Sequence, residues 1–514
     1  MNTKKFTILG ALMGIFLTSQ AQNSEESLLF SQYEQGATAR FKAMGNAQTS
    51  LGGDLSNISG NPAGLGFFNS SDASITLDYF GDKNKATYFG NPYDVSKDRV
   101  GLNQLGIVFN LPNMRARGSS LDQGWLNFNV GIGYNKTNSF HSKLTYAGAN
   151  PNSSIADFFI DQSYIDPNSA IGQIGWNFGL FDQGKAGDPY YGMTSLGNEQ
   201  GVMNNYSGYQ SETNLSFGAN YSNKLYLGAS VGLSTIDYQT NTHFYEDGFI
   251  LDQSYLQDQA NWEQSRFATD DGYKNLLNSD FNYDQQMWTH TKGTGVNFKL
   301  GMIYRPDEIF RIGISATTPT WYRMSDDWDD YYGIVNYEAN GGPQIGKPAE
   351  DASQGNYAEY NLRTPYRLNG GISAVFPRGL LSADVEFVDY SSIHFSSSDN
   401  NAIDLYNEDI KASYQGAVNF KVGGEFVLIP EVLLRAGYNH QGNPYKQADY
   451  KAQSITGGLG FRFGNYYVDV TYQNWRQEYN HSPYGFTPEM GLDNPVASVK
   501  NTRNNVFLTL GTKF

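Results

Sequence analysis

Charged side chains recur at alternate positions in the carboxyl-terminal half, in segments whose intervening positions are apolar. Lys421 and Glu425 fall on one face of the segment 415–428, and Arg435 and Arg462 belong to the next two such segments. Successive side chains of a β-strand point to opposite faces, so these charges would share the polar face of a sheet. Opposite signs on neighbouring strands predict cross-strand ion pairs, whereas an unpaired cation, with Arg435 and Arg462 as leading candidates, would bind a ligand carboxylate. The same parity places further charges on the polar face: Lys299, Asp384, Glu386, Asp469 and Lys513.

Catalytic and metal-binding patterns are missing from the sequence. The chain has no cysteine, its six histidines show no zinc-type spacing and are expected in or beside loops, and no G-x-S-x-G nucleophile motif occurs. Acidic runs at 325–332 and 269–273 lack the spaced ligands of an EF-hand loop, so they are interpreted as solvated loop charge rather than a Ca²⁺ site. We expect no enzyme activity, no cofactor and no metal.

Fourteen segments alternate apolar and polar residues between turn residues, which predicts fourteen β-strands. In the third segment Leu126 and Phe128 alternate with Asn127 and Asn129. One oily face and one polar face suit a barrel wall with lipid outside and water inside. The predicted fold is therefore an all-β transmembrane barrel of 14 antiparallel strands, over residues 71–514. The segments lie near 73–80, 102–111, 125–135, 209–221, 225–238, 293–304, 309–318, 365–376, 380–390, 415–428, 432–440, 453–463, 466–476 and 504–514.

Both ends of the chain carry signals of export. Lys4 and Lys5 precede a short apolar run and then small residues, which predicts a signal peptide over residues 1–21, cleaved after Ala21. The last predicted strand ends on Phe514, and a terminal aromatic residue resembles the signal by which outer-membrane barrels are recognised for assembly. We expect the protein in the bacterial outer membrane, in contact with outer-membrane lipid and lipopolysaccharide.

Short and long connections alternate between the predicted strands. The short ones lie at 222–224, 305–308, 377–379, 429–431 and 464–465. The long ones lie at 136–208, 239–292, 319–364, 391–414, 441–452 and 477–503. Short periplasmic turns and long outer loops are typical of outer-membrane barrels. Because 14 strands enclose a lumen too wide for wall side chains to fill, water or a plug must occupy it.

The candidate plug is the segment before the first strand, residues 22–70. It ends on Asn61-Pro62-Ala63, in which Pro62 fixes φ and lacks an N–H while Asn61 favours a turn, so a compact, non-helical stopper is expected. The alternative is a mere turn leading into the first strand. In this motif, in 319–322, in 364–368 and in its strand pattern, the chain resembles the FadL family of outer-membrane transporters for hydrophobic compounds, including TodX-like members. The resemblance implies an N-terminal hatch that plugs the lumen.

The resemblance also implies a route for ligand. In relatives the ligand leaves sideways, beside a kinked third strand, and Gly131 and Gly133 lie on the inward face of that strand here. Missing side chains at these positions would permit a bulge or kink. The alternative is that they are two among many glycines of the wall.

Two functions follow. The first is passive uptake of a hydrophobic small molecule, such as a long-chain fatty acid, gated by the hatch. The second is a non-transporting barrel that serves as partner or scaffold of an envelope secretion or assembly complex, because fold alone does not fix function. The formal charge of −16 opposes nucleic acid as a partner, since phosphate binding needs clustered Lys and Arg.

Overall fold

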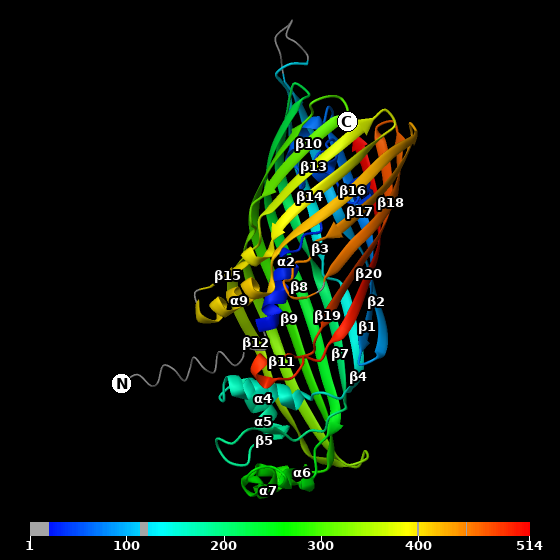
Figure 1. The fold of residues 1–514 in the computed structure, drawn as a ribbon. Coiled ribbons are helices and arrows are strands. Elements are labelled where there is room, and N and C mark those ends of the chain that lie inside the picture. Colours follow the sequence, from blue (N-terminus) through cyan, green and yellow to red (C-terminus); the bar gives the residue numbers. More distant parts are fainter. Residues whose placement is uncertain (1–19, 114–121, 398–399, 449) are drawn as a thin grey trace, which may run out of the picture.

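The computed structural model describes residues 20–113, 122–397, 400–448 and 450–514. These residues form a closed antiparallel barrel with fourteen strand positions in its wall (Figure 1). Ten positions hold one continuous strand each: β1 (Asp72–Tyr88), β2 (Asn91–Pro112), β7 (Asn198–Tyr221), β8 (Leu225–Phe249), β9 (Ser279–Tyr304), β16 (Gly416–Ile429), β17 (Val432–Gln441), β18 (Lys451–Phe463), β19 (Tyr466–His481) and β20 (Ala497–Lys513).

The other four positions hold interrupted strands, each in two parts. These are β3 (Trp125–Ser139) with β4 (Ser142–Asn150), β10 (Phe310–Thr317) with β11 (Trp321–Glu338), β12 (Gln344–Arg363) with β13 (Arg367–Phe376), and β14 (Gly379–Asp389) with β15 (His394–Ser396). The last strand, β20, pairs with β1 from Asp72↔Lys513 to Thr87↔Ser498 and closes the barrel. The predicted barrel of 14 antiparallel strands is confirmed.

The strands are much longer than the sequence pattern indicated. Residues 319–364, expected as a loop, form β11 and β12, and β9 begins at Ser279 rather than near 293. The acidic run 325–332 therefore lies in β11, and five of the six histidines lie in strands rather than loops. The reason is physical: a strand that extends beyond the bilayer faces water, so it does not need the alternation of oily and polar residues that marks the membrane-spanning part.

The outer face of the wall is oily where the alternation is regular. On β2, for example, Leu105, Phe109 and Leu111 are large apolar side chains that remain exposed. On β3 the apolar positions face outward, while Asn127 and Asn129 are buried inside. A closed barrel with an apolar exterior satisfies all its backbone polar groups in lipid, which indicates a bacterial outer-membrane protein.

Helices occupy the amino-terminal segment and the connections between strands. They are α2 (Gln20–Ser31), α3 (Ala39–Ala43), η1 (Leu55–Ile58), η2 (Pro62–Phe67), α4 (Ile155–Ile165), α5 (Ala170–Asn177), α6 (Gln253–Gln257), η3 (Trp262–Gln264), α7 (Arg266–Thr269), α8 (Asp271–Lys274), η4 (Tyr390–Ser392), α9 (Asn400–Ser413) and η5 (Pro488–Met490). In the described part of the chain, none is long and apolar enough to cross a membrane. Two short strands, β5 (Phe181–Asp182) and β6 (Tyr191–Gly192), pair only with each other.

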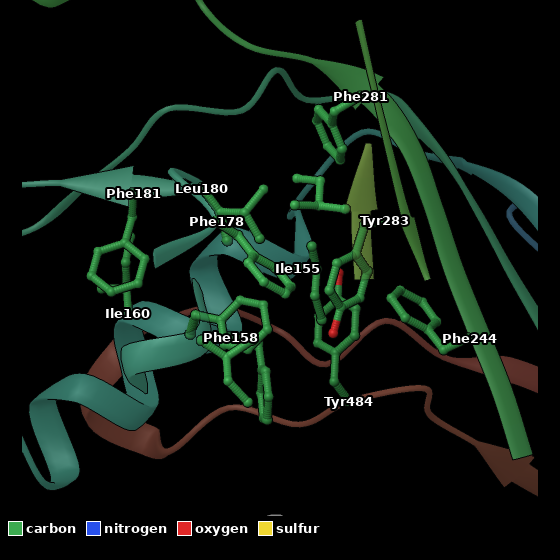
Figure 2. Packing of buried hydrophobic residues seen from close by; sticks show 14 of the residues in the cluster. Ile155, Phe158, Ile160, Phe178, Leu180, Phe181, Phe244, Phe281, Tyr283 and Tyr484 are labelled. Carbon is green, nitrogen blue, oxygen red and sulfur yellow. The ribbon is translucent and has the colours of Figure 1, made fainter. Parts of the chain in front are cut away.

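A large apolar core lies at the end of the barrel opposite the carboxyl terminus, and Figure 2 shows its packing. We call it the outer core. It joins α4 and α5 to Tyr88 of β1 and Val499 of β20 on one side of the wall, and to Tyr283 of β9 and Ile334 of β11 on the other. Because β1 and β20 lie across the barrel from β9 and β11, this core fills the mouth on that side.

The predicted signal peptide, residues 1–21, lies almost entirely outside the described residues. The same is true of most of the connection near 112–124, because residues 114–121 are outside the described ranges.

Candidate functional site

The motif Asn61-Pro62-Ala63 forms the beginning of η2 and contacts the inner wall. The Asn61 side-chain oxygen accepts a hydrogen bond from the Ala63 backbone N–H at 3.1 Å, so Asn61 caps the helix that Pro62 opens. Its amide group donates to the Thr49 carbonyl at 2.7 Å and to the Ile314 carbonyl of β10 at 3.3 Å. The motif thus connects two parts of the amino-terminal segment to the barrel.

Glycines of the wall make room for residues 37–68, which we call the seated segment. A Cβ at Gly301 of β9 would lie 1.8 Å from the Asn61 side-chain oxygen, and one at Gly228 of β8 would lie 2.2 Å from the Pro62 carbonyl carbon. Other close approaches, of 2.1–2.7 Å, occur around the circumference, at Gly218, Gly313, Gly423, Gly437 and Gly458. Only a residue without a side chain permits the backbones to meet so closely.

Gly131 and Gly133, which were predicted to permit a kink in the third strand, also belong to the wall glycines that make room for the seated segment. Both sit in regular pairing with β2 and β7, and a Cβ at either would meet the side chain of Ile58, at 2.9 and 3.3 Å. The irregularities of β3 lie on either side of these glycines: its register with β7 shifts between Trp125 and Asn127 and again between Lys136 and Asn138, and its pairing with β2 ends at Asn135. The structure therefore places these glycines beneath η1 rather than at the break.

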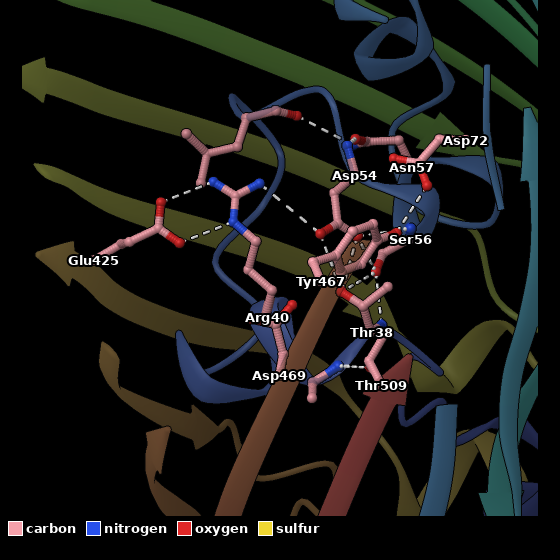
Figure 3. Close-up of polar contacts among 12 residues, drawn as sticks. Thr38, Arg40, Asp54, Ser56, Asn57, Asp72, Glu425, Tyr467, Asp469 and Thr509 are labelled. Atoms are coloured by element: carbon pink, nitrogen blue, oxygen red, sulfur yellow. Dashed lines mark hydrogen bonds and ion pairs between the residues drawn. The ribbon is translucent and has the colours of Figure 1, made fainter. Parts of the chain in front are cut away.

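Four charged residues were predicted to form ion pairs or to bind a ligand carboxylate, and three of them meet in one network. Figure 3 shows part of this network. Glu425 and Arg435 are cross-strand neighbours 2.6 Å apart, and Arg435 also contacts Asp469 at 2.6 Å. Arg462 reaches the same Asp469 oxygen at 2.9 Å. From the seated segment, Arg40 forms a two-pronged contact with Glu425, at 2.9 and 3.0 Å. This network ties the segment to β16, β17, β18 and β19.

The network is balanced in charge. Its three guanidinium groups face three carboxylates, those of Glu425, Asp469 and Asp54, the last 3.8 Å from Arg40. Burial alone would lower the pKa of Arg40, but the attraction of Glu425 and Asp54 outweighs it and raises that pKa above its usual value. Arg435 has a fully buried side chain with two carboxylate partners. Arg435 and Arg462 therefore carry no excess positive charge that would attract a ligand carboxylate.

Lys421, the fourth nominated charge, lies apart from this network and lines a polar cavity of about 50 Å³. Its ammonium is 3.6 Å from Glu386, which Arg367 approaches at 3.8 Å. Lys299, paired with Glu212, lines the same cavity. Three cations thus line the cavity with two carboxylates, and a third carboxylate, that of Asp384 on β14, belongs to the residue paired with Lys421 across the strands. Several buried amide atoms around the cavity have no hydrogen-bond partner: Nε2 of Gln35, Oδ1 of Asn46 and Asn297, Oε1 of Gln210, and both Nε2 and Oε1 of Gln48.

Beside this cavity lies a second buried apolar cluster, which we call the aromatic cluster. It surrounds Leu28 and Phe30 of α2 and comprises Phe140, Ile236, Tyr238, Tyr322, Met324, Leu362, Val388, Tyr390, Ile393, Phe395, Tyr406, Ile410, Tyr414 and Ala417. The Phe30 ring meets those of Phe140 and Tyr238 edge to face, with ring centres 5.8 and 5.5 Å apart. Tyr322 belongs to the cluster and also lines the polar cavity.

Three wall side chains hold the carboxyl end of α2. Asn138 of β3 donates to the Leu29 carbonyl at 3.3 Å, Gln210 of β7 donates to the Phe30 carbonyl at 3.2 Å, and Arg367 of β13 donates to the Ser31 carbonyl. The last carbonyls of a helix lack partners within it, so these donors complete α2. The amino-terminal segment was expected to be non-helical, but α2 and α3 are helices. The apolar triplet Leu28-Leu29-Phe30 was the one signal that could have indicated α2.

Metal chemistry has no visible support in this region. Among the described residues, no group of three or more His, Asp or Glu side chains is placed to hold a metal ion. The carboxylates of the interior instead accept hydrogen bonds and pair with Arg or Lys.

No protein-family model and no curated protein matches the chain. Among the solved structures that resemble it are two that cover nearly its whole length. A FadL homologue of Pseudomonas aeruginosa is 14% identical, with a TM-score of 0.54, over 94% of this chain and 100% of that one. The P. putida toluene transporter TodX is 15% identical, with a TM-score of 0.50, over 93% and 99%. The chain therefore has the fold of the FadL and TodX barrels, and the resemblance seen in its sequence is confirmed at the level of the fold.

Proposed function

We propose that the protein is an outer-membrane channel for the passive uptake of hydrophobic compounds such as long-chain fatty acids, with residues 22–70 as a hatch that closes the lumen. The observation that carries this proposal is the pairing of an apolar interior cluster with a polar cavity lined by three cations inside a lipid-facing barrel. An amphipathic acid needs both environments: apolar surface for its tail and a cation for its carboxylate.

The contacts of the seated segment support its assignment as a hatch. Besides the Arg40 contacts, Thr471 of β19 donates to the Ala39 carbonyl and Thr456 of β18 to the Ala43 carbonyl. On the other side Asn129 of β3 donates to the Leu65 carbonyl and Ser216 of β7 to the Ile58 carbonyl. Bonds to opposite sides of the wall suit a stopper that spans the lumen.

Within this function, we assign carboxylate binding to the cavity lined by Lys421 and Arg367, rather than to Arg435 or Arg462. The long ion-pair distances of Lys421 and Arg367 to Glu386, 3.6 and 3.8 Å, support this cavity, whereas the shorter contacts of Arg435 and Arg462 with their carboxylates, 2.6 and 2.9 Å, argue against the two arginines. The proposed exit is sideways through the wall at the break of β3, after Asn135, where its pairing with β2 ends.

Uptake of radiolabelled oleate by cells that lack their own fatty-acid channel tests the function. Expression of the wild-type chain should raise the initial uptake rate severalfold, and Lys421→Met should reduce that gain. The matched control is Lys500→Met, because Lys500 lies on β20 in an exposed ion pair with Glu478. No gain with a correctly assembled wild-type barrel would refute uptake of this ligand.

The outer core favours a second candidate, the non-transporting partner of an envelope complex. A core that fills the outer mouth obstructs direct passage along the barrel axis, and it fixes the loop helices as a rigid surface for docking. Purification in mild detergent separates the two candidates: partner chains in fixed stoichiometry together with absent oleate uptake would establish the second.

A further inference from the structure

The outward face of the barrel changes from apolar to positively charged on four neighbouring strands, β18, β19, β20 and β1. In the membrane-spanning part these strands present large apolar side chains that remain exposed, and the last of them towards the long connections are Ile455, Tyr472, Val506 and Tyr79. Val506 pairs with Tyr472 on one side and with Tyr79 on the other, so these three form one row. Such a row of aromatic and apolar side chains marks the membrane interface. The outward positions beyond it therefore lie at the level of the lipid headgroups.

Exposed cations occupy these positions on the same four strands. They are Lys451 of β18, Arg476 of β19, Lys500 of β20, and Lys83 and Lys85 of β1. The register places Arg476 and Lys83 in one row, on either side of Thr502. The other three lie in the row beyond, which also contains Glu478.

Two of the five cations are engaged by carboxylates. Lys500 lies 3.4 Å from Glu478, and Lys83 lies 3.2 Å from Asp94 of β2. The other three form no ion pair in the part of the chain that the structure describes, although two of them lie opposite these carboxylates in the register. We call these three residues the basic patch: Lys85, Lys451 and Arg476.

The outward face around the basic patch keeps an excess of positive charge. Neighbouring strands lie about 4.8 Å apart, so the patch spans about 14 Å from β18 to β1. One further carboxylate, Asp98 of β2, lies opposite Gly81, one row closer to the apolar side chains. The five cations therefore exceed the carboxylates of Glu478, Asp94 and Asp98 by two charges.

The opposite side of the wall carries more acidic than basic groups at its outward positions beyond the apolar rows. There β8, β9 and β11 hold Lys292 and Arg323 together with Asp237, Asp284 and Asp327. Lys292 lies opposite Asp237 in the register, and Arg323 is 2.9 Å from Glu359 of β12. The two sides of the barrel therefore differ in charge, and the basic patch belongs to one side alone.

A lipid that carries phosphate groups fits the side of the basic patch. Its acyl chains would lie along the exposed apolar side chains of the four strands, and its phosphates would accept charge-assisted hydrogen bonds from the cations. Long Lys and Arg side chains lie along an apolar surface while their charged ends stay in the polar region. The patch lies on the side of the long connections, which the pattern of connections predicts to be the cell exterior. The phosphate-bearing lipid of that leaflet is lipopolysaccharide.

We propose that the basic patch binds the phosphate groups of one lipopolysaccharide molecule, whose acyl chains lie along the apolar face of β18, β19, β20 and β1. Any outer-membrane protein is surrounded by this lipid, whereas the site holds one molecule at a fixed place. The site lies on the outside of the wall, and the cavity and the aromatic cluster lie inside it. The inference therefore goes beyond the proposed uptake and does not depend on it.

Two matched double substitutions test the site. Lys85→Gln with Arg476→Gln removes two cations of the basic patch, and the control, Lys292→Gln with Arg323→Gln, removes the same residue types from the opposite side. Deep-rough lipopolysaccharide is titrated onto the delipidated barrel in mild detergent. Each cation near an anionic lipid surface contributes about a factor of five, so the first variant should bind at least about tenfold more weakly than wild type. The control should bind like wild type.

Both variants must show the heat-modifiable gel mobility of a folded barrel. Unchanged binding by the folded Lys85→Gln, Arg476→Gln variant overturns the proposal. Equal weakening in the two double variants also overturns it, because the attraction would then come from the overall charge of the barrel rather than from the basic patch.

The chemistry of the ligand is tested on the wild-type chain. Removal of the phosphate groups from the same lipopolysaccharide should weaken binding at least about tenfold, because the cations lose their partners. Phosphatidylglycerol should bind at least about tenfold more weakly than lipopolysaccharide, and millimolar inorganic phosphate should not displace the bound lipid. Equal affinity for the phosphate-free lipid, equal affinity for phosphatidylglycerol, or displacement by inorganic phosphate would each refute a site for the phosphates of lipopolysaccharide.

Discussion

Two neighbouring parts of the amino-terminal segment are held inside the barrel in different ways. The seated segment, residues 37–68, meets wall glycines at backbone distance and is tied by buried charges on one side and by amide and hydroxyl donors on the other. The helix α2 touches the wall through the tips of side chains and packs against α9, itself part of a connection. Contacts through backbone geometry and buried ions are hard to break singly, while hydrogen bonds from single wall side chains can be lost one at a time. The segment therefore has a fixed part and a part that is held less firmly.

The largest expected effect comes from Arg435→Met, which removes a buried cation from the ion network that holds the seated segment. The change leaves the buried carboxylates of Glu425 and Asp469 without their shared partner, at a cost of roughly 3–5 kcal/mol. We expect a lower unfolding temperature and loss of protease protection over residues 37–68. Arg462→Met, whose side chain is 31% exposed, should have a clearly smaller effect. Equal effects of the two changes would contradict the network as described.

Gly301→Val tests the close approach of wall and segment. The added side chain would overlap the Asn61 amide, and overpacking of this kind costs about 1–3 kcal/mol. The seated segment should become accessible to protease while the barrel still assembles. The control is Gly370→Val on β13, where a Cβ would meet no atom within 4 Å. If residues 37–68 stay protected from protease in Gly301→Val, their position against the wall does not depend on glycine at this site.

Gln210→Met tests how firmly the wall holds α2. It removes the donor to the Phe30 carbonyl, a loss of about 1 kcal/mol for a neutral hydrogen bond. Amide hydrogen exchange should speed up roughly fivefold in α2 and remain unchanged in residues 37–68. Gln473→Met, at an equally buried glutamine of β19, should leave α2 unaffected. Faster exchange throughout the segment would mean that its two parts open together.

The smallest effect is the pH dependence of the Glu34–Lys42 ion pair, 3.3 Å apart, at the junction of the two parts. Burial would raise the pKa of Glu34, but the Lys42 ammonium and then Arg503 outweigh it, so the pKa lies below its usual 4.5. Because the pKa of Glu34 is lower in the folded than in the unfolded state, its charge stabilises the fold at pH values above the unfolded-state pKa. This stabilisation is lost as the pH falls through the folded-state pKa.

Thermal unfolding of wild type and Glu34→Gln should therefore differ at pH 7, by less than about 1 kcal/mol, and the two should converge as the pH falls below 4.5 and through the folded-state pKa. A difference that stays constant with pH would assign the effect of the substitution to packing rather than to charge.

The sequence was sufficient for the architecture of the membrane-spanning part and insufficient for the interior. Alternation located all fourteen strands because lipid imposes it, and it placed Glu425 and Arg435 on the inner face. It missed β11 and β12, where water imposes no such pattern. It could not separate Lys421 from the arginines, because parity gives the face of a strand but not the partner across a lumen. The sequence pattern placed these glycines on the inner face of the wall. It could not show that Ile58 and Asn61 pack against them, because those residues belong to a segment far away in the chain.

With the long connections on the cell exterior, as the pattern of short and long connections predicts, the outer core determines what other cells, phages and antibodies meet at the surface. Tyr484, from the connection before β20, packs against Phe158 of α4 and Phe244 of β8, and Asp161 of α4 accepts hydrogen bonds from Thr487. Surfaces built from two separate connections and the end of a strand are discontinuous epitopes. Peptides copied from any one loop lack the apolar partners that shape it, so antibodies raised against such peptides should recognise the denatured chain rather than the folded barrel.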